Sequence, residues 1–450
     1  MNKINKIVAV KTIYIYLFCA VFIVINMLSV GNSIASKHKN LEHKKSSLKN
    51  VKKKPLKTKN NIKNPAVNSK IEQSKQDIKS PSIEFPGPID KKIKNIEYLM
   101  QNSYFLLMDY QGKETLISKN ENERMAPSSM TKIMTAFVLF DNLKKGKIKL
   151  ENQCVIGTDA WRKRGSSMFL NYGDIVLIED LLKGLLVVSG NDAAIAIAEA
   201  VGGGYDNFIT LMNEKAKEIG LTNSHFTNPH GLNEPEHYMT LKDLAILMAR
   251  IYQDFPEYVH YLALEDFTYR NITQKNRNPL IKESYEGLIG GKTGHTNDGG
   301  YGIVGAVKRN NRILVGVVNK ASNSQIRTKL INAIFDYGFE DYKKLELFNK
   351  DKEISNLKIW LGKYDNVGVV SKEDIAINVP MDIDLKDILV KIEYSGPIYA
   401  PVQKGERIAN LVIEVKNYKK FEYPLFASST VNKVHYIRKI TQILKYKIKK

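Results

Sequence analysis

The chain has 450 residues, 43% of them hydrophobic, which is enough for two or three domains with buried cores. The net charge of +21 would suit a nucleic-acid partner, but it is concentrated in three segments: residues 1–35 carry +3, residues 36–83 carry +11 and residues 431–450 carry +7. Residues 84–430 are therefore neutral overall. This excludes the evenly basic folded surface of a typical nucleic-acid enzyme and favours a membrane surface or another polyanion as the partner.

The N-terminus resembles an export signal. A basic start precedes an apolar run over residues 12–30, and residues 33–35 form a small-x-small cleavage site. We therefore predict a signal peptide over residues 1–35. An uncleaved N-terminal anchor is the alternative, because 19 apolar residues nearly span a bilayer. Cys19 lies in this segment, so the exported chain would keep only Cys154 and no intramolecular disulfide.

Residues 36–88 are rich in Lys, Asn and Ser and contain almost no aromatic side chains. Such a composition cannot bury enough apolar surface to fold, so we predict a disordered basic tether. Attraction to anionic lipid or wall polymer is one interpretation of its charge. A solvated spacer is the other.

The next segment begins with strands and continues with helices. Residues 104–109 and 114–118 flank a turn and predict a β-hairpin. A helix is expected to start at Ser128 or Ser129, directly after Pro127. Apolar periodicity then predicts four more helices, at residues 178–188, 193–201, 205–219 and 241–251.

Strands return after residue 294. Residues 301–307 and 312–318 predict a second hairpin, and residues 325–337 predict a helix. Strands, then helices, then strands indicate an α+β domain, with an antiparallel sheet whose parts are joined across a helical insert. We place this domain at residues 89–345. Residues 346–430 contain short β-like segments such as 390–394 and 408–415, which predict a second, all-β domain.

The last segment, residues 431–450, combines apolar residues at three- and four-residue intervals with seven Lys or Arg and no acid. This pattern predicts a cationic amphipathic helix that lies in an anionic membrane interface. The alternative is a basic helix packed on the protein's own surface.

A first motif, Ser129-Met130-Thr131-Lys132, offers a nucleophile and a base. At a helix start, residues three apart lie on one face, so the Lys132 amine can reach the Ser129 hydroxyl. Lys132 must be neutral to accept the proton, which requires burial or a neighbouring cation such as Lys292. The Ser129 backbone N–H is placed to stabilise an oxyanion. Ser128 is a competing nucleophile, which we assign to helix capping instead.

Two further motifs supply polar groups. Ser189-Gly190-Asn191 offers a hydroxyl that can relay a proton and an amide that can hold a peptide carbonyl. Lys292-Thr293-Gly294 offers a cation and a hydroxyl for a substrate carboxylate, with a glycine for close approach. Each motif alone is weak evidence, but the three in this order indicate serine acyl-transfer chemistry. No clustered His or Cys spacing predicts a metal, and no cofactor is expected.

These motifs and their surroundings resemble the low-molecular-mass penicillin-binding proteins, the serine D-alanyl-D-alanine carboxypeptidases of peptidoglycan. The resemblance is carried by the segments 126–132, 184–194 and 291–296 and extends over roughly residues 95–450. It implies a β-lactamase/transpeptidase-like catalytic domain, an acyl-enzyme on Ser129 with Lys132 as general base, and a proton relay through Ser189.

The resemblance also implies the rest of the site and its setting. The second oxyanion donor would be the His295 backbone N–H. Asn191 and Gly294 would contact the substrate, and its carboxylate would be recognised by Lys292, Thr293 and Thr296, with help from Arg327 and, as a weaker candidate, Arg277. The expected substrate is a peptidoglycan pentapeptide, the expected inhibitors are β-lactams, and nucleic acid is not a partner. The implied role is cell wall biogenesis and cell shape. For the location we favour the periplasmic face of the inner membrane, with a Gram-positive cell surface as the alternative.

Three alternatives remain at this point. A class A β-lactamase would share two motifs, but the Ser-Gly-Asn element, the β-domain and the tail disfavour it. A peptidoglycan DD-endopeptidase would use the same residues. A non-catalytic wall-binding scaffold is disfavoured by the intact motifs.

Overall fold

The protein is described from a computed structural model that covers residues 11–12, 98–110, 114–310, 312–435 and 440. The predicted tether, nearly all of the predicted signal peptide and most of the predicted C-terminal helix lie outside these residues. The exceptions are the two-residue strand β1 (Lys11–Thr12), residues 431–435 and residue 440.

A five-stranded antiparallel sheet organises the first folded domain, in the order β3-β2-β10-β9-β8. Its strands are β2 (Tyr104–Asp109), β3 (Glu114–Lys119), β8 (Leu288–Thr296), β9 (Gly300–Arg309) and β10 (Arg312–Ala321). Both predicted hairpins are present. The sequence did not indicate the strand character of residues 288–296, which carry the third motif and lie at the sheet edge.

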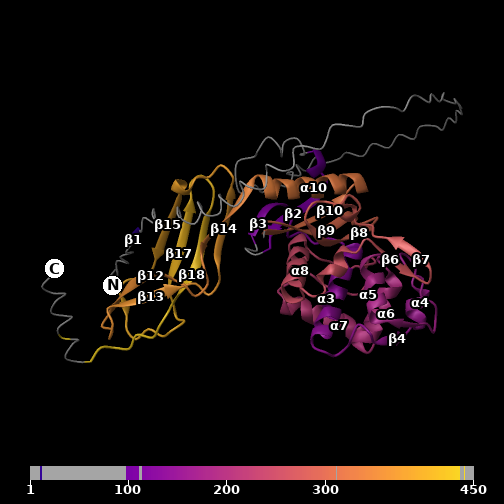
Figure 1. Ribbon diagram of the computed structural model, residues 1–450, viewed down its shortest axis with the longest axis horizontal. Helices are drawn as coiled ribbons and strands as arrows, with labels where there is room; N and C mark the ends of the chain where they lie inside the picture. Colours follow the sequence, from indigo (N-terminus) through magenta and orange to yellow (C-terminus); the bar gives the residue numbers. More distant parts are fainter. Residues whose placement is uncertain (1–10, 13–97, 111–113, 311, 436–439, 441–450) are drawn as a thin grey trace, which may run out of the picture. The chain divides into compact units, whose positions relative to one another are not determined.

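Successive side chains along a strand point to opposite faces of the sheet. Because apolar side chains occupy both sets of positions here, both faces of the sheet are buried. Along β10, Leu314 and Val318 join the apolar cluster that includes α10 (Ser324–Glu340), whereas Val315 and Val317 join the cluster of the helical lobe. Figure 1 shows α10 on one side of the sheet and the lobe on the other. This arrangement confirms the predicted α+β class.

The helical lobe lies between β3 and β8 in the sequence and contains the first two motifs. Its helices are η1 (Ser128–Thr131), α3 (Lys132–Lys144), α4 (Thr158–Arg162), α5 (Ile178–Leu186), α6 (Asn191–Gly202), α7 (Tyr205–Glu218), α8 (Leu241–Asp254), η2 (Val259–Ala263) and α9 (Pro279–Lys282). Its short strands are β4 (Gln153–Val155), β5 (Ile175–Leu177), β6 (Asp266–Tyr269) and β7 (Ile272–Lys275).

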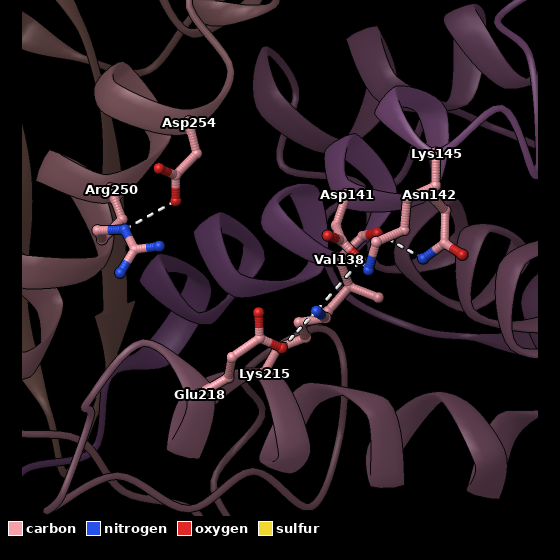
Figure 2. Close-up of polar contacts among 8 residues, drawn as sticks. All are labelled: Val138, Asp141, Asn142, Lys145, Lys215, Glu218, Arg250 and Asp254. Atoms are coloured by element: carbon pink, nitrogen blue, oxygen red, sulfur yellow. Dashed lines mark hydrogen bonds and ion pairs between the residues drawn. The ribbon is translucent and has the colours of Figure 1, made fainter.

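Ion pairs add only modestly to the packing of this lobe. Lys215 of α7 lies 3.4 Å from a carboxylate oxygen of Asp141 on α3, and Arg250 pairs with Asp254 within α8 (Figure 2). Solvated pairs of this kind contribute at most about 1 kcal/mol each. The apolar cluster, with fully buried side chains such as Phe140 from α3, therefore holds the helices in place.

The second folded domain is all-β, as predicted, with its own apolar core. Strands β15, β17, β18, β13, β12 and β16 lie in that order in one sheet, and β11 pairs with β14. Their bounds are β11 (Tyr342–Phe348), β12 (Glu353–Trp360), β13 (Asn366–Val370), β14 (Ile375–Pro380), η3 (Leu385–Asp387), β15 (Ile388–Glu393), β16 (Ile398–Tyr399), β17 (Arg407–Val415) and β18 (Lys420–Ala427).

The start of the predicted C-terminal helix differs from expectation. Residues 431–435 are not helical: Val431 and Lys433 form isolated bridges to Val402 and Gly362 of the β-domain. Pairing with the β-domain overrides the helical periodicity of these first residues. Within the described parts of the chain, no helix is long and apolar enough to cross a bilayer.

Candidate active site

The three motifs meet where the start of α3, the start of α6 and the edge strand β8 come together. Lys132 Nζ lies 3.1 Å from Ser129 Oγ, 2.8 Å from Asn191 Oδ1 and 2.7 Å from the His230 carbonyl oxygen. Ser129 is partly exposed, whereas Lys132 is completely buried. The structure therefore combines an accessible hydroxyl with a buried amine.

Burial determines the electrostatics of Lys132. Desolvation holds the pKa of the Lys132 amine well below its ordinary value, and the nearby charge of Lys292 lowers it further, while Asp192 opposes the shift. A lowered pKa raises the fraction of neutral amine that can accept a proton. Both causes that the sequence predicted, burial and Lys292, are present.

Lys292 is itself buried, and its pKa is lowered to about 7 by desolvation and by the charges of Arg277 and Arg327. Lys292 lies on the edge strand β8, next to β9. Strand β8 packs closely against η1 at Gly294, where an added Cβ atom would lie 3.0 Å from the Pro127 carbonyl oxygen. The site thus holds several cations close together, as the recognition of an anionic group requires.

Ser189 occupies the turn between α5 and α6, as predicted. It is buried, its backbone has a φ of +64°, and its Oγ has no hydrogen-bond partner among the residues that the structure describes. A positive φ is unfavourable for serine and is often retained at functional sites. An unpartnered hydroxyl is free to exchange a proton with a bound substrate.

Asn191, the predicted substrate contact, makes two hydrogen bonds within the protein. Its Oδ1 accepts a hydrogen bond from Lys132, and its Nδ2 donates to the Arg164 carbonyl oxygen at 2.9 Å. Both ends of the amide are therefore engaged by the protein. Gly165, with a φ of +103°, leaves room for the Asn191 side chain. Any other residue there would place its Cβ atom 2.6 Å from Asn191 Nδ2, which is too close.

Ser128 also differs from its predicted role. Its side chain caps no helix; instead its Oγ lies 3.0 Å from Thr296 Oγ1, which in turn accepts a hydrogen bond from the Gly299 N–H. Ser128 is buried and has a φ of +52°. This bond connects the residue before the first motif to the end of β8, a link that a purely local capping argument could not detect.

The sequence reasoning also missed the role of Asp192. This buried carboxylate accepts hydrogen bonds from the Ser167 hydroxyl and from the backbone N–H groups of Met168 and Leu170. It therefore fixes the loop that follows Ser166, whose carbonyl oxygen receives the Asn191 N–H. An acid in the first turn of α6 was the available signal.

The remaining candidates have varied surroundings. Thr293 and Arg327 are almost completely buried, Thr296 is partly exposed, and His295 is exposed with its ring centroid 4.0 Å from that of Tyr301. Arg277 donates a hydrogen bond to Ser166 Oγ. Within the described part of the chain, no group of three or more His, Cys, Asp and Glu residues could hold a metal ion.

Comparisons with known proteins agree with this fold. Residues 93–323 match the family model for D-alanyl-D-alanine carboxypeptidase, and residues 342–433 match that for the C-terminal domain of penicillin-binding protein 5. The chain is 33% identical over 338 residues to D-alanyl-D-alanine carboxypeptidase DacF of Bacillus subtilis, covering 74% of this chain and 86% of the relative. It is 35% identical to DacA of Haemophilus influenzae, covering 69% and 80%.

Solved structures give the same result. Penicillin-binding protein 5 from Haemophilus influenzae superposes with a TM-score of 0.70 at 32% identity, covering 73% of this chain and 97% of that protein. DacD from Francisella tularensis has a TM-score of 0.63 at 27% identity, covering 80% and 97%. Since a family model matches half of the chain and relatives above 30% identity match most of it, this chain belongs to the D-alanyl-D-alanine carboxypeptidase family.

Proposed function

We propose that this protein removes the terminal D-alanine from peptidoglycan pentapeptides through an acyl-enzyme on Ser129, and that penicillin blocks it by acylating the same oxygen. The observation that carries this proposal is the 3.1 Å approach of Lys132 Nζ to Ser129 Oγ, with the amine buried and its pKa lowered. A buried amine with a lowered pKa beside a hydroxyl is the arrangement that nucleophilic catalysis by serine requires.

In the acylation step, neutral Lys132 accepts the Ser129 hydroxyl proton while Oγ bonds to the carbonyl carbon of the penultimate D-alanine. The negative charge on the carbonyl oxygen is stabilised by the backbone N–H groups of Ser129 and His295. The peptide C–N bond then breaks, and the leaving amine receives its proton through Ser189. The products are free D-alanine and an ester on Ser129.

Deacylation reverses the roles of the same groups. Water replaces the departed amine, gives a proton to Lys132 and attacks the ester carbonyl carbon. The C–O bond to Ser129 breaks, the hydroxyl regains its proton, and the tetrapeptide leaves with a new carboxylate. A β-lactam enters by the first step, since its ring amide is also opened by Ser129 Oγ.

Recognition of the terminal carboxylate falls to the cationic side of the site. Lys292 supplies charge, Thr293 and Thr296 supply hydroxyls, and Arg327 adds positive charge from α10. Gly294 leaves room for the substrate backbone. Asn191 acts first as a positioning residue, because its amide already holds Lys132 and the Arg164 carbonyl.

The test uses the full-length protein with a pentapeptide and a fluorescent penicillin. We expect D-alanine release and covalent labelling from the wild type, and neither from the Ser129→Ala variant. Labelling without D-alanine release, together with cleavage of a cross-linked peptide dimer, would support the endopeptidase alternative. Absence of labelling and of any cleavage would leave only a wall-binding scaffold.

The pH dependence of kcat/KM should reflect two lysines with opposite requirements. Activity should rise with pH as Lys132 loses its proton, because only the neutral amine is a base. It should fall as pH passes about 7, because Lys292 then loses the charge that attracts the carboxylate. The Lys292→Arg variant keeps its charge at all these pH values. The fall in its activity at alkaline pH should therefore begin more than one pH unit higher than in the wild type. An unchanged alkaline limb would rule out Lys292 as the titrating group.

Ser128 should tune substrate binding through Thr296. We expect the Ser128→Ala variant to raise KM by about threefold to tenfold with kcat nearly unchanged, as the loss of one hydrogen bond of about 1 kcal/mol predicts. A double-mutant cycle with Thr296→Val should show coupling of similar size. Additive effects of the two substitutions would contradict the link.

We further propose that the protein is exported and attaches peripherally to the periplasmic face of the inner membrane through residues 436–450. Their apolar periodicity and six cationic side chains support this proposal. Deleting residues 436–450, which leaves the bridges of Val431 and Lys433 intact, should shift the protein from the membrane to the soluble fraction. Retention in the membrane would favour the uncleaved N-terminal anchor.

A further inference from the structure

An exposed patch of apolar and cationic side chains lies on the helical lobe. Val155 and Ile175 are register partners on β4 and β5 and are 69% and 67% exposed. Trp161 and Tyr172 lie beside them, 47% and 65% exposed, with ring centroids 6.3 Å apart. Exposed Arg162 and Arg164 complete the group, which we call the rim patch.

The rim patch is one connected surface. The Gly173 N–H donates to the Ile156 carbonyl oxygen, and the Ile156 N–H donates to the Asp174 carbonyl oxygen, so the loop that carries Tyr172 lies against the end of β4. The Arg162 guanidinium lies 5.8 Å from the Trp161 ring centroid. Clustered exposed apolar side chains of this kind mark interaction surfaces more often than isolated ones do.

The patch adjoins the active site through Arg164. The Arg164 carbonyl oxygen receives the Asn191 Nδ2–H, and Arg164 is three residues from Trp161. Three residues span at most about 11 Å of chain. Trp161, and Tyr172 beside it, are therefore within reach of a ligand that occupies the site and extends past Arg164.

We propose that the rim patch binds the glycan strand of peptidoglycan next to the stem peptide that is being cleaved. This inference rests on the proposed function, because a stem peptide at Ser129 is covalently joined to a polymer that must lie outside the mouth. Flat aromatic rings pack against the C–H faces of sugar rings, and Arg162 and Arg164 complement the carboxylates of neighbouring stem peptides. The patch thus distinguishes polymeric substrate from free peptide.

The test compares two substrates for the full-length protein: intact insoluble peptidoglycan and a soluble pentapeptide. The double variant Trp161→Ala/Tyr172→Ala should release D-alanine from the polymer about tenfold more slowly, as the loss of aromatic contacts predicts. Its rate on the soluble peptide and its rate of penicillin labelling should stay within twofold of the wild type. The matched control is Tyr364→Ala/Tyr399→Ala, which removes two exposed rings from the β-domain and should leave both rates unchanged.

Two outcomes would overturn the proposal: an unchanged rate on the polymer, or an equal fall on both substrates. Failure of the wild type on the soluble peptide would instead contradict the proposed function, so the two failures are distinguishable.

A second measurement tests binding without catalysis. The protein is first acylated with penicillin, which blocks the site, and is then sedimented with peptidoglycan or with anionic phospholipid vesicles. The single charge variant Arg162→Glu should lose peptidoglycan binding; loss of vesicle binding alone would assign the patch to the membrane and overturn the proposal.

Discussion

Replacing Lys132 by arginine should lower kcat/KM for the pentapeptide, and the rate of penicillin acylation, by about 1000-fold. General-base catalysis contributes about 100-fold to 10,000-fold, and arginine keeps its proton under all ordinary conditions. The variant retains a cation next to Ser129 but cannot accept the hydroxyl proton. The measurement is single-turnover acylation by a chromogenic β-lactam, which isolates the step that needs the base.

Lys132→Met is the matched comparison, because it removes the charge and keeps the length of the side chain. If Lys132 acts as a base, both variants should be similarly slow. If its charge alone matters, arginine should retain much of the activity and methionine should not. Circular dichroism and melting temperature check that each variant folds, since the position is completely buried.

Replacing Gly231 by alanine should damage both stability and acylation. Gly231 has a φ of +84°, and a Cβ atom there would lie 1.8 Å from the Ser128 carbonyl oxygen. Backbone strain and overpacking each cost about 1–3 kcal/mol, so the melting temperature of the catalytic domain should fall by about 5 °C or more. Relief of the clash displaces the chain at Ser128 and hence the adjacent nucleophile, so penicillin labelling should slow as well.

Gly146→Ala is the control for this change. Gly146 also has a positive φ, of +67°, but a Cβ atom there would meet nothing within 4 Å. The control therefore measures the conformational cost alone, about 1 kcal/mol. Equal effects of the two substitutions on labelling and on melting temperature would contradict the view that a side chain at Gly231 displaces Ser128 and the adjacent Ser129.

The sequence was sufficient for features that depend on local pattern. Apolar periodicity located α5 and α6 within two residues, and the turn between them contains Ser189 as expected. The spacing of Ser129 and Lys132 on one helical turn predicted that their side chains would meet, and the 3.1 Å distance from Lys132 Nζ to Ser129 Oγ agrees. These elements were predictable because each is encoded by neighbouring residues.

The features that the sequence reasoning missed depend on contacts between distant segments. Ser128 bonds to Thr296, 168 positions later, so its side chain is not available for the predicted cap. The hydrogen bonds of Asn191 to Lys132 and to the Arg164 carbonyl oxygen, and those of Asp192 to a loop more than twenty residues earlier, also join distant segments. Residues 431–435 bridge to the β-domain instead of forming a helix. In each case tertiary hydrogen bonds outweigh a local preference.

The most direct test of the account identifies the acylated oxygen. Trypsin releases residues 125–132 as one peptide, which contains both Ser128 and Ser129. After penicillin treatment of the full-length protein, tandem mass spectrometry should place the added mass on Ser129, with fragment ions that end at Ser128 unmodified. The Ser128→Ala variant should still carry the modification. Added mass on Ser128, or labelling that persists in the Ser129→Ala variant, would contradict the assignment of Ser129 as the nucleophile.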